Sequence, residues 1–438
     1  MDVTARRAVS GETPHAEHRH AHTARVLDTS SLAELAEELR RTQSDPEGVG
    51  IMTRKGRIYP VRLDEVSLRA AVLLKQEMLA VGGDASHARG VADLSVEHSA
   101  VVLLATWGQY QRLIPKLRRQ PFRLREVAEE VDEALRNYAH RGPRTIRGAH
   151  RSLVVGDRPR VMGVVNVTPD SFSDGGQYLD PERAIAQVLR LAQEGADAID
   201  IGGESTRPGA TPVAPEEEWR RIGPVLAGLE EHVDRLRIPI SVDTRHAEVA
   251  RRAIEAGADI INDVTGLGAP EMRRVIHEHR AAAILMHMRG TPATMQLDTS
   301  YSDLRAEVFR SLAQATDRAI AEGIPAERLI VDPGLGFGKS AEQSLELLTH
   351  VGELRSLGYP VVLGASRKSM LGPGSSENRT EAGLAAAVLA AWNGADLLRV
   401  HDVAATVRAL SIVTRSRGRM YPEGEETEAL ARPEEIER

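Results

Sequence analysis

The sequence predicts an α/β protein in which a (β/α)8 TIM barrel follows a smaller N-terminal accessory domain of α or α/β type. The chain has 438 residues, more than the ~100–200 of a usual domain. From about residue 150 onward, eight short apolar runs rich in β-branched residues alternate with stretches typical of helices. The runs are apolar throughout rather than alternating, which indicates parallel strands covered on both faces. Eight strand–helix units in about 270 residues match a TIM barrel.

The eight predicted strands cover residues 161–167, 198–203, 239–244, 260–264, 282–288, 329–334, 361–366 and 397–402. A doubly wound open sheet is the competing topology. Such a sheet usually carries a glycine-rich dinucleotide fingerprint after its first strand. Here the first strand leads into Asn166-Val167-Thr168-Pro169-Asp170 instead, which favours the barrel.

The remaining segments divide the chain into four parts. Residues 1–25 form a His-rich tail predicted to be disordered, 26–148 an accessory domain of unknown function, 149–419 the barrel, and 420–438 an acidic tail. Within the accessory domain, the apolar spacing of Leu68, Val72 and Leu79 predicts a helix that Gly82-Gly83 ends. The Arg-, Gly- and Pro-rich residues 141–148 are predicted to be a linker.

Composition excludes several classes of function. The net charge of −7 offers no general attraction for nucleic acid or an anionic membrane. No stretch reaches the ~18–20 apolar residues of a membrane span, and the first residues lack the apolar region of a secretory signal. The chain has no cysteine, which excludes disulfides, thiolate zinc sites and a cysteine nucleophile. We therefore expect a cytoplasmic protein with no membrane or nucleic-acid partner.

Two charged stretches have a functional and a simpler interpretation. His15, His18, His20 and His22 lie in the N-terminal tail and could bind a divalent metal. We favour a solvated tail. The basic residues between Lys116 and Arg125 could contact an anion or a nucleic acid. Leu113, Leu117 and Leu124 interrupt them, so the surface of an amphipathic helix is preferred.

Polar side chains follow the predicted strands at the point where each one ends. In a barrel these ends meet at one mouth, so residues distant in the sequence become neighbours. A helix N-cap is the alternative for any single Asp or Asn, but it does not account for all eight ends. The residues are Asn166, Glu204, Thr206, Arg207, Asp243, Asn262, Met286, His287, Asp332, Ser366, Arg367, Lys368, Arg399 and His401.

Three segments between strands and helices are rich in turn-forming residues. Residues 166–176 and 204–209 read as loops over the mouth, and Arg207 in the second can reach an anion. Residues 332–340 end in Gly-Lys-Ser like a phosphate-binding P-loop. Pro333 stands where that motif requires glycine, so we reject a nucleotide site there. The glycines of this segment are expected to let Phe337 approach a ligand.

The strand ends suggest two kinds of binding group. Arg399 and His401 are two residues apart and should project to the same side, near the usual phosphate site of barrels and near Arg367 and Lys368. The acids Asp243 and Asp332, with the amide of Asn262, suit a flat nitrogen heterocycle. For Asp243 and Lys368 the alternative is a structural ion pair across the barrel.

These runs resemble the dihydropteroate synthase family over about residues 155–415. The similar motifs, in family order, are MGVVNVTPDSFSDGG, AIDIGGESTRPGA, SVDT, INDV, LMHM, DPGLGFGK, GASRKSM and RVHDV. The resemblance implies a transferase that condenses 6-hydroxymethyl-7,8-dihydropterin diphosphate with 4-aminobenzoate, giving 7,8-dihydropteroate and diphosphate in folate biosynthesis. It also implies Mg²⁺ as cofactor, a homodimer, and inhibition by sulfonamides.

The resemblance further implies a role for each matching residue. Asp332, Lys368, Arg399 and His401 are the implied catalytic residues. The implied pterin site consists of Asp243, Asn262, Met286, Asp332 and Lys368. The implied diphosphate site consists of Asn166, Thr206, Arg399 and His401, with Asn166 also contacting Mg²⁺. The implied aminobenzoate site consists of Thr206, Arg207, Pro208, Phe337 and Ser366.

The chemistry of this reaction agrees with those residues. The diphosphate leaving group gains negative charge that Mg²⁺, Arg399 and His401 would stabilise. The dihydropterin can delocalise a cation on its exocyclic methylene, so an SN1-like path is expected, with Asp332 as a fixed negative charge. The aniline nitrogen attacks unprotonated, so no histidine base is assigned. Positioning by closed loops supplies most of the advantage.

Two alternatives and two departures from the family remain. A pterin-binding methyltransferase would not need the diphosphate residues Asn166, Arg399 and His401, and a catalytically silent paralogue would not need a closing loop. Residues 373–383 differ from the usual family loop. The N-terminal extension is a docking or oligomerisation module, or a remnant of a fused enzyme.

Overall fold

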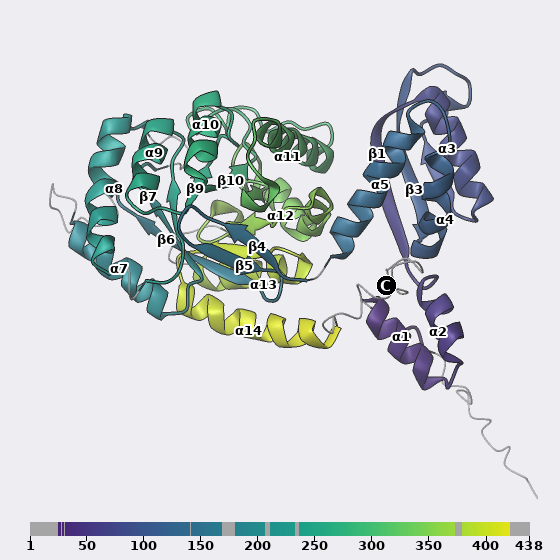
Figure 1. Ribbon diagram of the computed structural model, residues 1–438, viewed down its shortest axis with the longest axis horizontal. Helices are drawn as coiled ribbons and strands as arrows, with labels where there is room; N and C mark the ends of the chain where they lie inside the picture. Colours follow the sequence, from purple (N-terminus) through teal and green to yellow (C-terminus); the bar gives the residue numbers. More distant parts are fainter. Residues whose placement is uncertain are drawn as a thin grey trace, which may run out of the picture.

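The structure is a computed structural model with two parts, a barrel and an accessory domain, which lie side by side (Figure 1). It describes residues 25–27, 29, 31–140, 142–168, 180–205, 211–232, 236–372 and 379–420. The two predicted tails lie outside these residues, except Arg25 and Met420.

All eight predicted barrel strands are present, and they pair in parallel in the order β11-β10-β9-β8-β7-β6-β13-β12. A parallel bridge between Val331 and Val361 joins the two ends of this sheet and closes it. Every residue of β7 and of β10 is buried, as expected for strands covered on both faces. The predicted (β/α)8 barrel is therefore confirmed. The strands are β6 (Arg160–Asn166), β7 (Ala198–Gly202), β8 (Ile240–Asp243), β9 (Ile260–Asp263), β10 (Ala282–Met286), β11 (Leu329–Asp332), β12 (Val362–Leu363) and β13 (Leu397–Val400).

Helices surround the barrel and bury their apolar stripes against the outer face of the strands (Figure 1). Asp180 caps the first of them by accepting hydrogen bonds from the backbone N–H groups of Glu182 and Arg183. The α-helices are α7 (Pro181–Gln193), α8 (Pro215–Glu230), α9 (Ala247–Glu255), α10 (Pro270–His279), α11 (Leu304–Ala321), α12 (Ala341–Thr349), α13 (Thr380–Asn393) and α14 (Val403–Met420). Short 3-10 helices are η2 (Ala326–Arg328), η3 (Val351–Leu357) and η4 (Ser369–Leu371).

A β-hairpin closes the floor of the barrel, at the end opposite the mouth. Its strands are β4 (Arg144–Arg147) and β5 (Ser152–Val155), which pair antiparallel. Ile146, Leu153 and Val155 join one apolar cluster with residues at the start of the barrel strands, such as Met162. The linker predicted over residues 141–148 is therefore wrong from Arg144 onward, and the barrel begins earlier than residue 149. The hairpin was hidden because four residues carry too little periodicity to predict a strand.

The accessory domain combines helices with a three-stranded antiparallel sheet, so it is of the α/β type. The sheet order is β1-β3-β2, and β3 alternates exposed and buried residues because only one face is covered. Leu74 and Met78 of the predicted helix are buried in the core, whereas Leu79 is exposed. The elements are α1 (Leu32–Arg41), α2 (Pro46–Thr53), β1 (Ile58–Ser67), α3 (Leu68–Ala80), β2 (Asp84–His87), η1 (Arg89–Val91), β3 (His98–Thr106), α4 (Trp107–Leu117) and α5 (Leu124–Ala139).

The basic stretch of this domain is an amphipathic surface, as preferred from the sequence. Leu113, Leu117 and Leu124 are fully buried in the accessory core. Arg118 forms ion pairs with Glu129 at 2.9 Å and Asp132 at 3.0 Å. These acids neutralise part of the basic charge, so the stretch contains no uncompensated cationic run.

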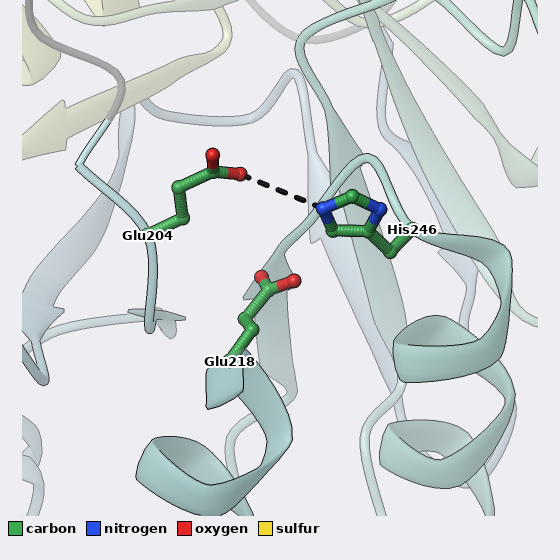
Figure 2. Close-up of side chains that lie close together, drawn as sticks. All are labelled: Glu204, Glu218 and His246. Atoms are coloured by element: carbon green, nitrogen blue, oxygen red, sulfur yellow. Dashed lines mark ion pairs between the residues drawn. The ribbon is translucent and has the colours of Figure 1, made fainter. Parts of the chain in front are cut away.

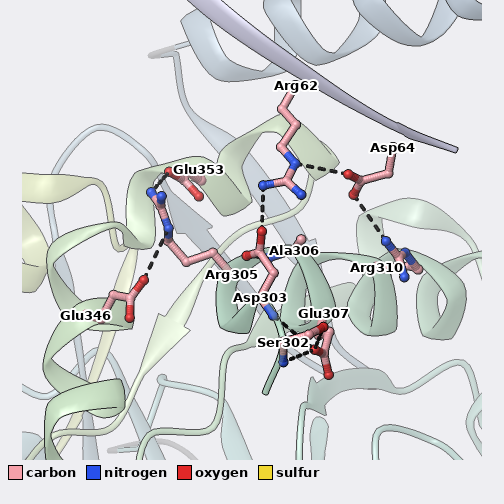
Figure 3. A network of polar contacts seen from close by, with 10 residues as sticks. All are labelled: Arg62, Asp64, Ser302, Asp303, Arg305, Ala306, Glu307, Arg310, Glu346 and Glu353. Carbon is pink, nitrogen blue, oxygen red and sulfur yellow. Dashed lines mark hydrogen bonds and ion pairs between the residues drawn. The ribbon is translucent and has the colours of Figure 1, made fainter. Parts of the chain in front are cut away.

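Polar contacts join the accessory domain to the barrel on the side of α11 (Figure 3). Arg62 of β1 donates a hydrogen bond of 2.6 Å to Asp303, which caps α11 by accepting from the N–H of Ala306. Arg310 of α11 reaches back to Asp64 of β1 at 3.3 Å. These side chains are partly exposed, so each pair is worth only about 0–1 kcal/mol.

No helix in the described ranges is both long enough and apolar enough to cross a membrane.

Candidate active site

The mouth of the barrel holds a buried polar network centred on Asp200 of β7. Asp200 is completely buried and accepts hydrogen bonds from Ser241 at 2.5 Å, from Asn262 at 3.2 Å and from Arg399 at 2.6 Å. The other branch of the Arg399 guanidinium donates to Asp243 at 2.9 Å. Asp200 thus holds Asn262 and Arg399 directly, and Asp243 through Arg399. All three were predicted to bind the pterin or the diphosphate, whereas Asp200 was not singled out from the sequence.

Asp200 was missed because it is the third letter of an otherwise apolar run, AIDIGG. The signal was available, since an ionisable residue in a strand buried on both faces requires a partner. The partner is Arg399, nearly 200 positions later in the chain. The sequence left open a structural ion pair between Asp243 and Lys368. In the structure Asp243 forms its ion pair with Arg399 instead.

Burial and neighbouring charges shift the pKa values of these groups. Burial raises the pKa of Asp243 and of Asp332, against the lowering effects of Arg399 and Lys368 respectively. Burial lowers the pKa of Lys368 to about 8, although Asp332 opposes the shift. For Arg399 the desolvation is outweighed by Asp200 and Asp243, so its pKa is raised and it stays charged.

Asp332 ends β11 and begins the segment predicted to hold Phe337. Its Oδ1 accepts from the N–H of Gly334 at 2.7 Å. Gly334 has φ of 67°, and a Cβ there would lie 2.0 Å from the carbonyl oxygen of His287, so glycine is required. Met286, opposite Asp332 in the β10–β11 register, lies beside this turn and is 5% exposed.

Lys339, the lysine of the rejected P-loop, has a structural role. It is 2% exposed and donates hydrogen bonds to the carbonyl oxygens of Gly334 and Phe337, each at 3.0 Å. It also contacts Nδ1 of His287 at 2.9 Å. Burial and Lys339 lower the pKa of His287 to about 3, so His287 is neutral. Because the Lys339 ammonium donates to carbonyl oxygens of its own loop, it is not directed at a phosphate.

Four of the predicted site residues form two contacting pairs, Lys368 with Phe337 and Ser366 with His401. The Lys368 ammonium lies 4.8 Å from the centre of the Phe337 ring and donates to the carbonyl of Leu335. Ser366 Oγ and His401 Nδ1 are 3.0 Å apart, which places these two side chains in contact. Arg367, next to them, is instead paired with Asp402 at 2.9 Å.

Asn166 ends β6 beside Gly202 of β7. A Cβ built on Gly202 would lie 3.8 Å from Asn166 Oδ1 and 3.9 Å from Asp243 Oδ2. Both are ordinary contact distances, so the oxygens of Asn166 and Asp243 lie near the same point of β7. Thr206, Arg207 and Pro208 lie outside the described residues, as do residues 169–179 of the first predicted loop and residues 373–378 of the segment that departs from the family.

A second polar cluster lies beside the mouth, and the sequence had indicated only one of its members, Glu204. It consists of Glu204, Glu218 and His246 (Figure 2). Burial raises the pKa of Glu218 to about 8, although Thr244 donates a hydrogen bond to it. Glu218 is one of three consecutive glutamates, and the sequence alone does not indicate which of them is buried.

The comparisons with known proteins agree with this geometry. Residues 162–401 match the family described as "Pterin binding enzyme". A dihydropteroate synthase of Synechocystis is 45% identical over 263 residues, covering 59% of this chain and 90% of the relative. A Xanthomonas albilineans dihydropteroate synthase solved with 4-aminobenzoic acid is 48% identical, with a TM-score of 0.58, covering 62% of this chain and 98% of that one.

A longer relative also matches the accessory domain. A probable bifunctional folylpolyglutamate synthase/dihydropteroate synthase of Halobacterium salinarum is 42% identical over 404 residues. The match covers 91% of this chain and 48% of the relative. The chain thus spans about half the length of the first curated relatives it matches.

The barrel and the family match place the chain in the class of pterin-binding (β/α)8 enzymes. Within that class, the matches across the whole barrel are to dihydropteroate synthases. The chain belongs to the dihydropteroate synthase family.

Proposed function

We propose that this chain condenses 6-hydroxymethyl-7,8-dihydropterin diphosphate with 4-aminobenzoate to form 7,8-dihydropteroate and diphosphate. The observation that carries the proposal is the buried network in which Asp200 holds Asn262 and Arg399, and Arg399 also holds Asp243. A rigid set of acids, an amide and a guanidinium suits the edge of a flat, nitrogen-rich pterin.

Recognition of the pterin depends on groups whose orientation is already set. The bond to Asp200 fixes the plane of the Asn262 amide. The bond to Gly334 fixes the Asp332 carboxylate. A ligand that binds such groups needs little reorganisation of the site, which favours affinity and positioning.

The leaving diphosphate needs positive charge and hydrogen-bond donors at the mouth. Arg399, Lys368 and His401 are the described groups that supply them, and Arg207 is proposed to add a further cation. As the C–O bond breaks, the cation on the pterin methylene is stabilised by its own ring. The buried Asp332 carboxylate, when ionised, adds a negative charge beside it.

Magnesium is part of the proposal. Asn166 offers its amide oxygen at the end of β6, and such a donor fits Mg²⁺, which prefers oxygen ligands and retains several waters. When bound, the ion would neutralise charge on the diphosphate. Asn166 would hold it on the protein side.

The second substrate requires positioning rather than proton removal. The amine of 4-aminobenzoate is unprotonated at neutral pH. Among the described mouth residues, His287 is neutral and engaged with Lys339, and His401 contacts Ser366. We therefore assign no general base, and we assign Phe337 and Ser366, with Thr206, Arg207 and Pro208, to the aminobenzoate site.

The experiment that tests this function is a product assay by chromatography with both substrates and Mg²⁺. We expect 7,8-dihydropteroate in the complete mixture and none when either substrate is omitted. Absence of product from folded protein would contradict the proposal. A homodimer, to be measured by light scattering, and a cytoplasmic location are further parts of the proposal that rest on family resemblance and composition.

A further inference from the structure

Three side chains from three barrel segments converge beside the mouth (Figure 2). Glu204 follows β7, Glu218 lies in the first turn of α8, and His246 immediately precedes α9. One ligand atom of each lies within 4.8 Å of the others. Figure 2 shows the Glu218 carboxylate pointing toward the space between Glu204 and His246.

Two buried atoms of this cluster have no hydrogen-bond partner within the described part of the chain. Glu218 is 0% exposed, and although Oε2 accepts from Thr244 at 3.0 Å, Oε1 is left unpartnered. Nε2 of His246 is likewise buried without a hydrogen-bond partner, and lies at the longer ion-pair distance of 3.9 Å from Glu204 Oε2. Buried polar atoms are costly unless something satisfies them.

Neighbouring residues fix the orientation of the Glu204 carboxylate through hydrogen bonds, as is common for carboxylates that bind metals. Arg245 donates to both oxygens of Glu204, at 3.1 and 3.0 Å, and the N–H of Val213 donates to Oε1 at 3.1 Å. Such outer contacts orient carboxylate ligands. A divalent cation that binds here would displace the proton from Glu218, and the two carboxylates would then outnumber the single positive charge of Arg245.

We propose that Glu204, Glu218 and His246 form a site for a divalent transition-metal ion of the zinc class. Two carboxylate oxygens and one imidazole nitrogen are a donor set that suits Zn²⁺, whereas Mg²⁺ prefers oxygen alone. Zinc–ligand distances of roughly 2.0–2.2 Å require the three side chains to close by about 1 Å.

The proposed zinc site differs from the proposed magnesium contact at Asn166. Glu204 lies two residues before Thr206, so the metal would anchor the point from which the predicted aminobenzoate segment departs. The inference does not depend on the proposed reaction, because metal binding is measured without either substrate.

The test is zinc binding to the full-length chain. Because His15, His18, His20 and His22 provide a separate background, all four are changed to serine in the parent protein. Zn²⁺ titration followed by gel filtration and elemental analysis should give one equivalent per chain. In that parent, Glu218→Gln and His246→Gln should each weaken binding at least about tenfold.

Matched controls are Glu216→Gln, an exposed glutamate of the same helix turn, and His279→Gln at the end of α10. Both should retain the zinc, and Mg²⁺ should not compete for it. Zinc should also raise the melting temperature of the parent and not of the two ligand variants. If Glu218→Gln fails to fold, His246→Gln carries the test. No zinc bound by the parent, or equal affinity in the ligand variants, would overturn the proposal.

Discussion

At the scale of single residues, the site depends on one buried acid that makes no predicted contact with substrate. Asp200 holds Arg399 and Asn262 in place through hydrogen bonds of 2.6 and 3.2 Å. The predicted ligand residues were recognisable because their motifs resemble a family. Asp200 was not, since its role depends on contacts with residues far away in the sequence.

Asp200→Asn should lower kcat/KM by about 100-fold. An asparagine has one acceptor oxygen, whereas the Asp200 carboxylate accepts hydrogen bonds at both of its oxygens. The Arg399 guanidinium would therefore be displaced from its position toward the substrate. Steady-state kinetics measures the effect, with circular dichroism to check the fold. Asp317→Asn, on the exposed side of α11, is the control. Unchanged kinetics in Asp200→Asn would show that the network does not position Arg399.

The pKa of Lys368, lowered to about 8, predicts a pH dependence of pterin binding. Below this pH the side chain is a charged ammonium, and above it the charge is lost, so affinity for the pterin diphosphate should fall as pH rises through about 8. Titration calorimetry from pH 6.5 to 9.5 measures this. The Lys368→Arg variant keeps its positive charge across this pH range, so its affinity should no longer fall as pH rises. If affinity falls equally in that variant, another group causes the pH dependence.

At the scale of elements, sequence patterns located all eight barrel strands because continuous apolar runs are characteristic of strands covered on both faces. They did not locate the floor hairpin. The sequence Arg144–Arg147 contains one apolar residue, Ile146, and only the barrel interior makes that residue part of a core. Thr206, Arg207 and Pro208 lie outside the described residues and stay predictions.

Ile146→Ala should destabilise the barrel by about 2–5 kcal/mol, because it leaves a cavity among fully buried side chains at the floor. Denaturant unfolding followed by fluorescence or circular dichroism gives the free energy of unfolding. Val154→Ala lies in the same hairpin but is 42% exposed, and it should cost less than about 1 kcal/mol. Equal effects of the two substitutions would contradict the packing of this hairpin against the floor.

At the scale of the whole molecule, the accessory domain has its own core and contacts the barrel through packing of α5 against η3 and through polar pairs. Besides the Arg62–Asp303 pair, Asn137 of α5 donates to the carbonyl of Ser356 at 3.3 Å, and Arg355 donates to the carbonyl of His140. The Halobacterium relative has a matching accessory region, whereas the match to the Synechocystis relative covers 59% of this chain. Among the residues that the structure describes, the apolar clusters of the barrel and of the accessory domain share no residue, so the barrel core does not depend on this domain for its burial.

A chain shortened to begin at residue 142 should fold and retain its kinetics within a few-fold, because it keeps the floor hairpin. One that begins at residue 150 loses β4 and should be less stable, since β5 loses its partner and the floor cluster loses Ile146. Thermal melting and activity assays compare the two. Loss of folding in the chain that begins at residue 142 would show that the accessory domain is required for the barrel.

The measurement that tests the central claim most directly is diphosphate release from dihydropterin diphosphate, with and without 4-aminobenzoate, in the full-length chain and in Arg399→Ala. We predict Mg²⁺-dependent release with both substrates present, little release without 4-aminobenzoate, and a large loss of turnover and diphosphate affinity in the variant. Release that is equally fast without 4-aminobenzoate, or unaffected by Arg399→Ala, would contradict a condensing enzyme built around this network.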